Sequence, residues 1–387
     1  MRAALSEALG AIGADPTRSQ HISRLLKLDK SLAWKISKIV TDDDPFAAIP
    51  RLPGRAGVRI LLESLEQAKI PPAALSELRD AMADFDKMVE THAGTRETLQ
   101  MMLGNQHSES RRERDESHRK LAFQGNSAIW GAQARVQLSS HFIAPSATMP
   151  DRLDIAIISG LIDFRRLRHD VPWAVATARL LNDMGELLPL GELTPMDESV
   201  APGGVPMMRE FCSPSLPPLN VVRTHSGRSR FEIGQGPVGN SAAATCMTGW
   251  INRACVSPYA SPDNRYGENH VTISTPTEVL FHDLFVHESL AFALHPALSV
   301  YSLLPGGPTY PADGHDKGLL SVETDILNLG LGPPDLTTHE LPRYRQMVEF
   351  AAGRIGYPLN QFYGFRYKLR FPPIPALAVF RYRLPEK

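Results

Sequence analysis

The sequence predicts a multidomain protein in which an all-α N-terminal domain is followed by a larger α+β domain with a mostly antiparallel sheet. A chain of 387 residues is too long for one typical hydrophobic core. Its first hundred residues carry apolar side chains at helical spacing, whereas the remainder is rich in proline, glycine and short apolar runs. We therefore expect a helical domain over residues 1–104, a charged linker or exposed helix over 105–120, and an α+β domain over 121–387.

The composition is typical of a folded globular protein. Apolar residues make up 43% of the chain and charged residues 21%, which excludes a disordered chain or a coiled-coil rod. The chain has no apolar run of about 18 residues, and its first segment contains Glu7 and lacks the apolar stretch of a signal peptide. We expect a soluble, cytoplasmic protein without a membrane partner. Three cysteines without a close CxxC pair predict reduced thiols.

Helical periodicity defines the elements of the first domain. Gly13 is expected to end the first helix, and the pair Asp15 and Pro16 to begin the second. A third helix follows KLDK, and the acidic, proline-rich segment TDDDPFAAIPRLPG predicts a loop. Further helices are expected over 57–68, 72–91 and 95–103.

Charge is distributed unevenly in this domain. Residues 15–40 contain six lysines or arginines against two aspartates, and residues 41–103 contain seven basic against eleven acidic residues. A basic segment beside an acidic one is expected where one element faces a polyanion. The near-neutral net charge of −1 shows that the whole surface is not basic.

The segment SRLLKLDKSLAWKIS within this basic region resembles helix-turn-helix transcriptional regulators over about 25 residues. The matching positions run from Leu26 through a short polar turn to Ser31, Ala33 and Ile36. Lys27 stands where that family commonly has glycine, so a left-handed conformation there would cost ~1 kcal/mol relative to glycine. The resemblance implies that the second helix of the motif enters the major groove of double-stranded DNA.

If the motif binds DNA, its contact residues can be named. The lysines would contact phosphates, Ser31 or Lys35 would reach base edges, and Trp34 would stack on the partner or cap the core. Because one short recognition helix covers few base pairs, we expect a homodimer. The alternative is a helical hairpin with a solvated basic face. The candidate DNA-binding residues are Arg18, Lys30, Ser31, Trp34, Lys35 and Lys38.

The second domain shows its clearest strand pattern near the C-terminus. In YGFRYKLRF, aromatic and apolar residues alternate with Arg366, Lys368 and Arg370, which predicts a strand with one apolar and one basic face. The segment ALAVFRYRLP predicts a strand that either pairs with the first through the PPIP turn or lies in an adjacent layer. A helix is expected over 343–354.

The second domain shows no motif for a metal, a cofactor or a nucleophile. His282 and His287 are five residues apart, which aligns them on neither a helix nor a strand face, so a metal would need distant ligands such as His270 or His295. GQGPVGNS has a proline where a phosphate-binding loop needs a donating amide, and predicts a connection between strands. We expect no cofactor and no metal.

Two basic groups are candidates for binding a small anionic effector, because arginine presents a planar fork of donors to carboxylates and phosphates. They could equally be solvated sheet faces. These candidates are Arg166 and Arg168 in DFRRLRHD, and Arg366, Lys368 and Arg370 in the C-terminal strand.

The sequence therefore predicts a sequence-specific DNA-binding transcriptional regulator whose second domain senses an effector or oligomerises. One alternative is a hydrolase-like enzyme with its catalytic centre in the second domain and a helical docking module. Another is a protein-interaction scaffold that binds a partner through Trp34.

Overall fold

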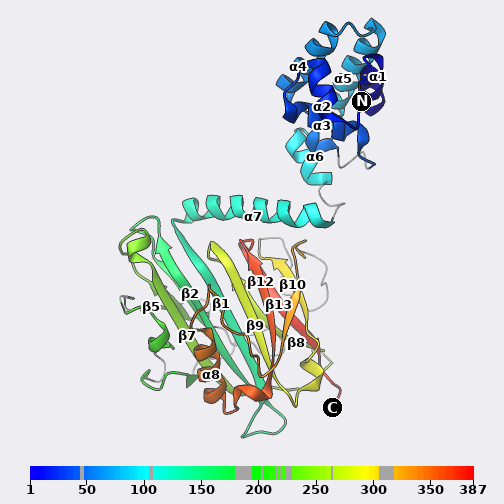
Figure 1. Cartoon of the computed structure of the whole chain (residues 1–387). Coiled ribbons are helices and arrows are strands. Elements are labelled where there is room, and N and C mark those ends of the chain that lie inside the picture. Colours follow the sequence, from blue (N-terminus) through cyan, green and yellow to red (C-terminus); the bar gives the residue numbers. More distant parts are fainter. Residues whose placement is uncertain are drawn as a thin grey trace. The chain divides into compact units, whose positions relative to one another are not determined.

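The computed structural model describes residues 1–43, 48–103, 108–178, 194–201, 204–214, 216–217, 219–223, 229–262, 265–304 and 318–387. It divides into two compact units, Met1–Arg111 and Arg112–Lys387 (Figure 1). The fold class is α+β, with eight α-helices and a large, mostly antiparallel sheet among the described residues.

All described secondary structure of the first unit is helical. Its α-helices are α1 (Arg2–Ala11), α2 (Ser19–Leu26), α3 (Lys30–Thr41), α4 (Arg55–Gln67), α5 (Pro72–His92) and α6 (Arg96–Leu103). Within TDDDPFAAIPRLPG, the described residues include a short 3-10 turn, Ile49–Arg51. Part of that predicted loop, residues 44–47, lies outside the described residues.

The start of α2 differs from the prediction. The Asp15 carboxylate accepts hydrogen bonds from the Thr17 amide and hydroxyl at 2.9 and 2.6 Å, which forms a local turn, and α2 begins only at Ser19. A short acidic side chain can satisfy the backbone two residues ahead of it as well as cap a helix. These hydrogen bonds also lower the pKa of Asp15.

The first unit packs around one apolar core. The core joins the inward faces of all helices from α1 to α5, with Leu5, Ile22, Ile36, Leu65 and Leu78 almost fully buried. The helical spacing of these residues gives each helix one apolar stripe, and burying the stripes together holds the short helices in place.

The second unit begins with a long helix followed by thirteen strands among the described residues. The helix α7 (Ser108–Trp130) continues beyond the predicted segment 105–120, of which residues 105–107 lie outside the description. The strands are β1 (Ala132–Pro145), β2 (Leu153–Arg166), β3 (Trp173–Ala178), β4 (Thr194–Pro195), β5 (Leu219–Arg223), β6 (Ser229–Ile233), β7 (Ala244–Val256), β8 (Tyr266–Ile273), β9 (Thr277–His287), β10 (Ala297–Ser302), β11 (Ile326–Leu331), β12 (Phe362–Arg370) and β13 (Ala376–Arg383). One further helix, α8 (Tyr344–Ile355), precedes β12.

These elements form three layers. Seven strands make the central sheet in the order β11-β12-β9-β1-β2-β7-β4, in which only the β1–β9 pair is parallel. A three-stranded sheet, β10-β13-β8, covers one face, and α8 packs on the other face against β2 and β7. Figure 1 shows α7 running across one end of the long strands. A further sheet, β3-β6-β5, joins the strands near β2.

The two C-terminal strands lie in different layers. β12 pairs with β9 in the central sheet, whereas β13 pairs with β8 and β10 in the smaller one. The predicted alternation of β12 is confirmed, since Phe365, Tyr367 and Leu369 are buried between the two sheets. Its basic face lies on the side of α8, where the Arg366 guanidinium stacks on Tyr344.

A polar network is buried between the central sheet and α8. The Arg366 guanidinium lies 2.8 Å from the Asp283 carboxylate, and the Tyr344 hydroxyl donates to the same carboxylate at 2.6 Å. The Ser140 hydroxyl lies 2.7 Å from the Tyr344 oxygen. All four side chains are buried, so the network joins β1, β9, β12 and α8. Burial beside Asp283 raises the pKa of Tyr344 well above its ordinary value.

Among the described residues, no helix combines the length and the apolar character that crossing a membrane requires.

Candidate nucleic-acid interface

The turn between α2 and α3 has the backbone conformation that the helix-turn-helix resemblance implies. Lys27 caps α2 with φ 52° and ψ 35°, in the left-handed region. The Leu28 amide donates to the Ser23 carbonyl at 3.1 Å, which is typical of left-handed helix ends, and the Ser23 hydroxyl donates to the Leu28 carbonyl at 2.7 Å. Asp29 then caps α3 by accepting from the Ser31 amide at 2.7 Å.

One side of α3 fixes the helix in the core. Ala33 and Ile36 are fully buried and Ile39 nearly so. The Ser37 hydroxyl donates to the Pro16 carbonyl at 2.6 Å, which ties α3 to the segment before α2. Because α2 and α3 pack directly on each other, the turn and this buried face together determine which side of α3 faces outward.

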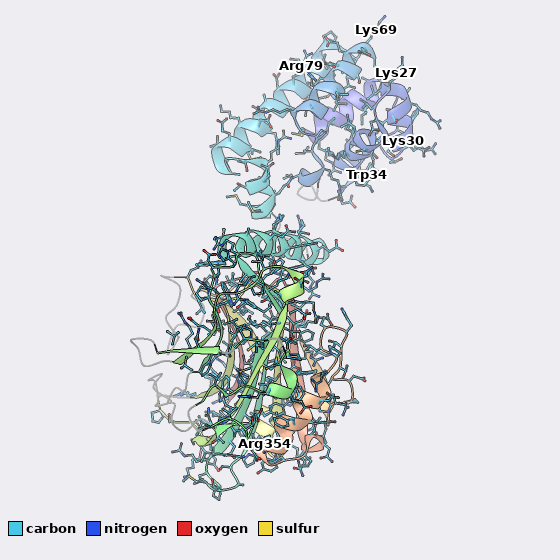
Figure 2. All side chains as sticks on the ribbon, turned by 90° about the vertical axis from the view of Figure 1, so that its left-hand side faces the viewer. Lys27, Lys30, Trp34, Lys69, Arg79 and Arg354 are labelled. Carbon is cyan, nitrogen blue, oxygen red and sulfur yellow. The ribbon has the colours of Figure 1, made fainter. Side chains whose placement is uncertain are left out.

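The opposite side of α3 carries the residues that the sequence analysis selected. Lys30, Ser31, Trp34 and Lys38 are exposed, and Lys35 is half-buried. Their spacing of three or four residues places them along one stripe of the helix. In Figure 2 the labelled Lys27, Lys30 and Trp34 follow one edge of the first unit. The prediction that these side chains share an outward face is consistent with this geometry.

The lysines of this face have no ion-pair partner among the residues that the structure describes. Lys30, Lys35 and Lys38 form no salt bridge there, and neither do Arg24 and Lys27 on the preceding helix and turn. Unpaired ammonium groups are free to exchange their counterions for phosphates. The positive charge counted in the sequence is therefore presented to solvent.

Arg18 lies at the start of α2, and fewer contacts fix its side chain than fix α3. Its side chain is 79% exposed and its guanidinium lies 3.4 Å from Asp15. Arg18 is the N-cap residue of α2 and makes no side-chain hydrogen bond to the start of the helix. The positive end of the helix dipole lies at this start and favours an anion.

Trp34 faces solvent and not the core. Its side chain is 46% exposed, and the Arg51 guanidinium lies over its ring at 6.0 Å from the centroid. Arg51 also pairs with Asp42 at the end of α3. Sequence reasoning did not select Arg51, because the loop that carries it gives no periodic pattern. The Arg51 guanidinium, paired with Asp42, therefore lies beside the outward face of α3.

The first predicted anion group is split by the structure. Arg166 is buried, donates to the carbonyls of Val171 and Gly234, and stacks on Phe164, so its guanidinium links the connection between β2 and β3 to the segment that follows β6. Burial lowers the pKa of Arg166. Arg168 lies beyond the end of β2 and is exposed, beside Gly131.

The second predicted anion group is engaged within the chain. Arg366 pairs with Asp283, and Lys368 donates to Glu340 at 2.6 Å. Arg370 is 59% exposed and lies 3.3 Å from Glu116 of α7. The three side chains follow one face of β12, as predicted, but each has a carboxylate partner.

The histidines of β9 do not gather. His282 is buried between the carbonyls of Ser139 and Asn269, at 3.3 and 3.2 Å, and burial lowers its pKa. His287 instead hydrogen-bonds to Ser289 and contacts the Tyr357 ring, with 4.5 Å between the ring centroids. Across the described part of the chain, no group of three His, Cys, Asp or Glu side chains could hold a metal ion.

The three cysteines are free thiols. The Cys212 thiol donates to the Met247 carbonyl at 3.4 Å and accepts from the Met247 amide at 3.3 Å, which places it beside Cys246 on β7. The neighbouring Cys212 thiol and burial raise the pKa of Cys246. Burial likewise raises the pKa of Cys255 to about 12. Spacing alone could not reveal the Cys212–Cys246 contact, because it depends on how the chain before β5 lies along β7.

Comparison with protein-family models and with the sequences of curated proteins finds no match for this chain. The case for a function therefore depends on the geometry of the outward face of α3.

Proposed function

We propose that the protein is a DNA-binding transcriptional regulator in which α3 enters the major groove of double-stranded DNA. The observation that carries the proposal is the outward face of α3, where three lysines without a described partner flank Ser31 and Trp34. A helix of twelve residues is about 18 Å long at 1.5 Å per residue, which suits a groove about 12 Å wide.

The residues have separable roles in this proposal. Lys30, Lys38 and Arg18 contact phosphates and set the position of the helix on the duplex. Ser31 and Lys35 lie in the first half of α3, from which recognition helices contact base edges. The exposed ring of Trp34, with the Asp42-paired Arg51 guanidinium over it, forms a flat surface beside them that suits packing against a sugar-phosphate strand.

The second unit serves oligomerisation in this proposal. Two copies of a short recognition helix, one helical turn of DNA apart, supply the specificity that one copy lacks. We do not extend the proposal to an anionic effector at Arg366, Lys368 and Arg370, since all three have carboxylate partners within the chain.

The test is a fluorescence-anisotropy titration of the full chain with random duplexes and with duplexes selected for binding. The variant Lys30→Ala/Lys35→Ala/Lys38→Ala should lose about 10²-fold or more in affinity for both at low salt. The control Arg59→Ala/Arg79→Ala/Lys87→Ala removes the same formal charge from exposed positions on α4 and α5.

The control should bind within about twofold of the unmodified protein, since a distant exposed charge acts only through a screened field. Equal affinity of all three proteins would refute the proposed interface. Equal losses in both variants would show that net charge and not α3 determines binding. Ser31→Ala, tested on the selected duplexes alone, should reduce discrimination and leave random binding unchanged.

A further inference from the structure

The second half of α7 exposes an apolar face, whereas the first half of the helix is strongly charged. Residues 111–120, RRERDESHRK, contain eight charged residues, whereas residues 121–130, LAFQGNSAIW, contain none. Leu121 and Ile129 are 66% and 67% exposed. Ala122, Gly125 and Ala128 are exposed beside them. These five residues form the α7 patch.

The second unit holds this patch in a fixed outward orientation. On the inner side of α7 the Phe123 ring lies 5.4 Å from the Phe371 ring, and Arg119 pairs with Glu323 at 3.0 Å. Arg112 pairs with Asp325 and Glu116 with Arg370. In these inward contacts, several charged side chains in the first half of α7 are paired with residues of the second unit. The contacts prevent the helix from turning its apolar side inward.

The spacing of the patch matches its own two-fold copy. Leu121, Gly125 and Ile129 are four residues apart, so they lie on one side of the helix with Gly125 midway. In an antiparallel pair centred on Gly125, Leu121 of one copy faces Ile129 of the other, and the reverse contact follows by symmetry. The absence of a side chain at Gly125 allows the two helices to approach closely.

Charge selects this antiparallel arrangement over a parallel one. In an antiparallel pair the uncharged segments overlap with each other, and each charged half extends past Trp130, where the partner helix ends. A parallel pair would place identical charged halves side by side, and like charges in contact are destabilising.

The geometry points to the α7 patch as the surface through which two copies of this chain associate. The partner is a second copy, because the patch is apolar, free of charge and complementary to itself about Gly125. A patch of this size is smaller than a permanent interface, so the pairing belongs to the reversible class. The inference concerns the second unit and does not depend on DNA binding by α3.

Disulfide cross-linking of the full chain without DNA tests the inference. A Cβ at Gly125 would meet nothing within 4 Å in the chain, so Gly125→Cys fits the fold. With a mild oxidant, this variant should form covalent dimers about tenfold faster or more than Ser117→Cys, because pairing raises the local thiol concentration. Ser117 is exposed on the same helix but would face a position beyond the partner helix in the antiparallel pair.

The unmodified protein gives the background rate from the native thiols. Adding Leu121→Glu and Ile129→Glu to Gly125→Cys should lower its rate to that of Ser117→Cys, while the circular dichroism spectrum stays unchanged because both positions are exposed. Equal rates for Gly125→Cys and Ser117→Cys would overturn the inference, as would a Gly125→Cys rate that the two glutamates do not change. If the patch is instead covered by another part of the same chain, Gly125→Cys stays monomeric, which also overturns it.

Discussion

The left-handed turn at Lys27 gives a quantitative prediction about how α3 is positioned. Lys27 has φ 52° and ψ 35°, a conformation that costs a non-glycine residue ~1–2 kcal/mol. Glycine avoids this cost but adds ~0.5–1 kcal/mol of conformational freedom to the unfolded chain. Lys27→Gly should therefore stabilise the α2–α3 pair by about 0.5–1 kcal/mol relative to Lys27→Ala, which removes the same charge but keeps the strain.

Hydrogen exchange of the full chain, read by mass spectrometry on peptides covering α2 and α3, measures this difference locally. The expected free-energy change corresponds to about two- to fivefold slower exchange in Lys27→Gly than in Lys27→Ala. Peptides from the second unit are the internal control and should exchange equally in both variants. Faster exchange of α2 and α3 in Lys27→Gly than in Lys27→Ala would refute the assigned turn, and with it the geometry that presents the outward face of α3.

Two further predictions concern the second unit. Arg366→Met leaves the buried Asp283 carboxylate without its cation, so it should lower the free energy of unfolding by about 3–5 kcal/mol in urea denaturation. The double variant Asp283→Leu/Arg366→Met should recover much of that loss. Equal stability of the two variants would contradict the pairing. Although burial alone favours a protonated Glu340, the Lys368 ammonium at 2.6 Å and the other hydrogen bonds to the carboxylate together outweigh it and lower the pKa of Glu340 from 4.5 to about 2. Because this pKa is depressed in the folded state, the ionised Glu340 stabilises the fold above pH 4.5, and this stabilisation is lost as the pH falls toward 2. The thermal unfolding temperature of Glu340→Gln should therefore depend less on pH in that window than the unfolding temperature of the unmodified chain.

Local sequence patterns predicted most of the helices and the strands with clear alternation of apolar and polar residues. Periodicity located α4, α5, α6 and α8 to within about two residues, and alternation located both faces of β12. The start of α2 was misplaced because Asp15 bonds to Thr17 and not to a helix start. Local patterns left open which layer β13 joins, since its pairing with β8 and β10 is a long-range choice.

The candidate sites show the same division. The outward residues of α3 could be selected from the sequence because helical spacing and charge are local properties. The carboxylate partners of Arg366 and Lys368 could not, because Asp283 and Glu340 come from β9 and from the segment before α8. The basic residues of the strand therefore suggested a site for an external anion, whereas carboxylates of the same chain already occupy those positions.

The salt dependence of DNA binding tests the central claim most directly. Each lysine that contacts a phosphate contributes about 0.9 to the slope of log K against log salt. Lys30→Ala/Lys35→Ala/Lys38→Ala removes the two phosphate contacts of Lys30 and Lys38, so it should reduce the magnitude of that slope by about 1.8, which over one decade of salt gives a difference in affinity of about 60-fold. Arg59→Ala/Arg79→Ala/Lys87→Ala should leave the slope unchanged. An unchanged slope in the α3 variant would contradict the claim that α3 faces DNA.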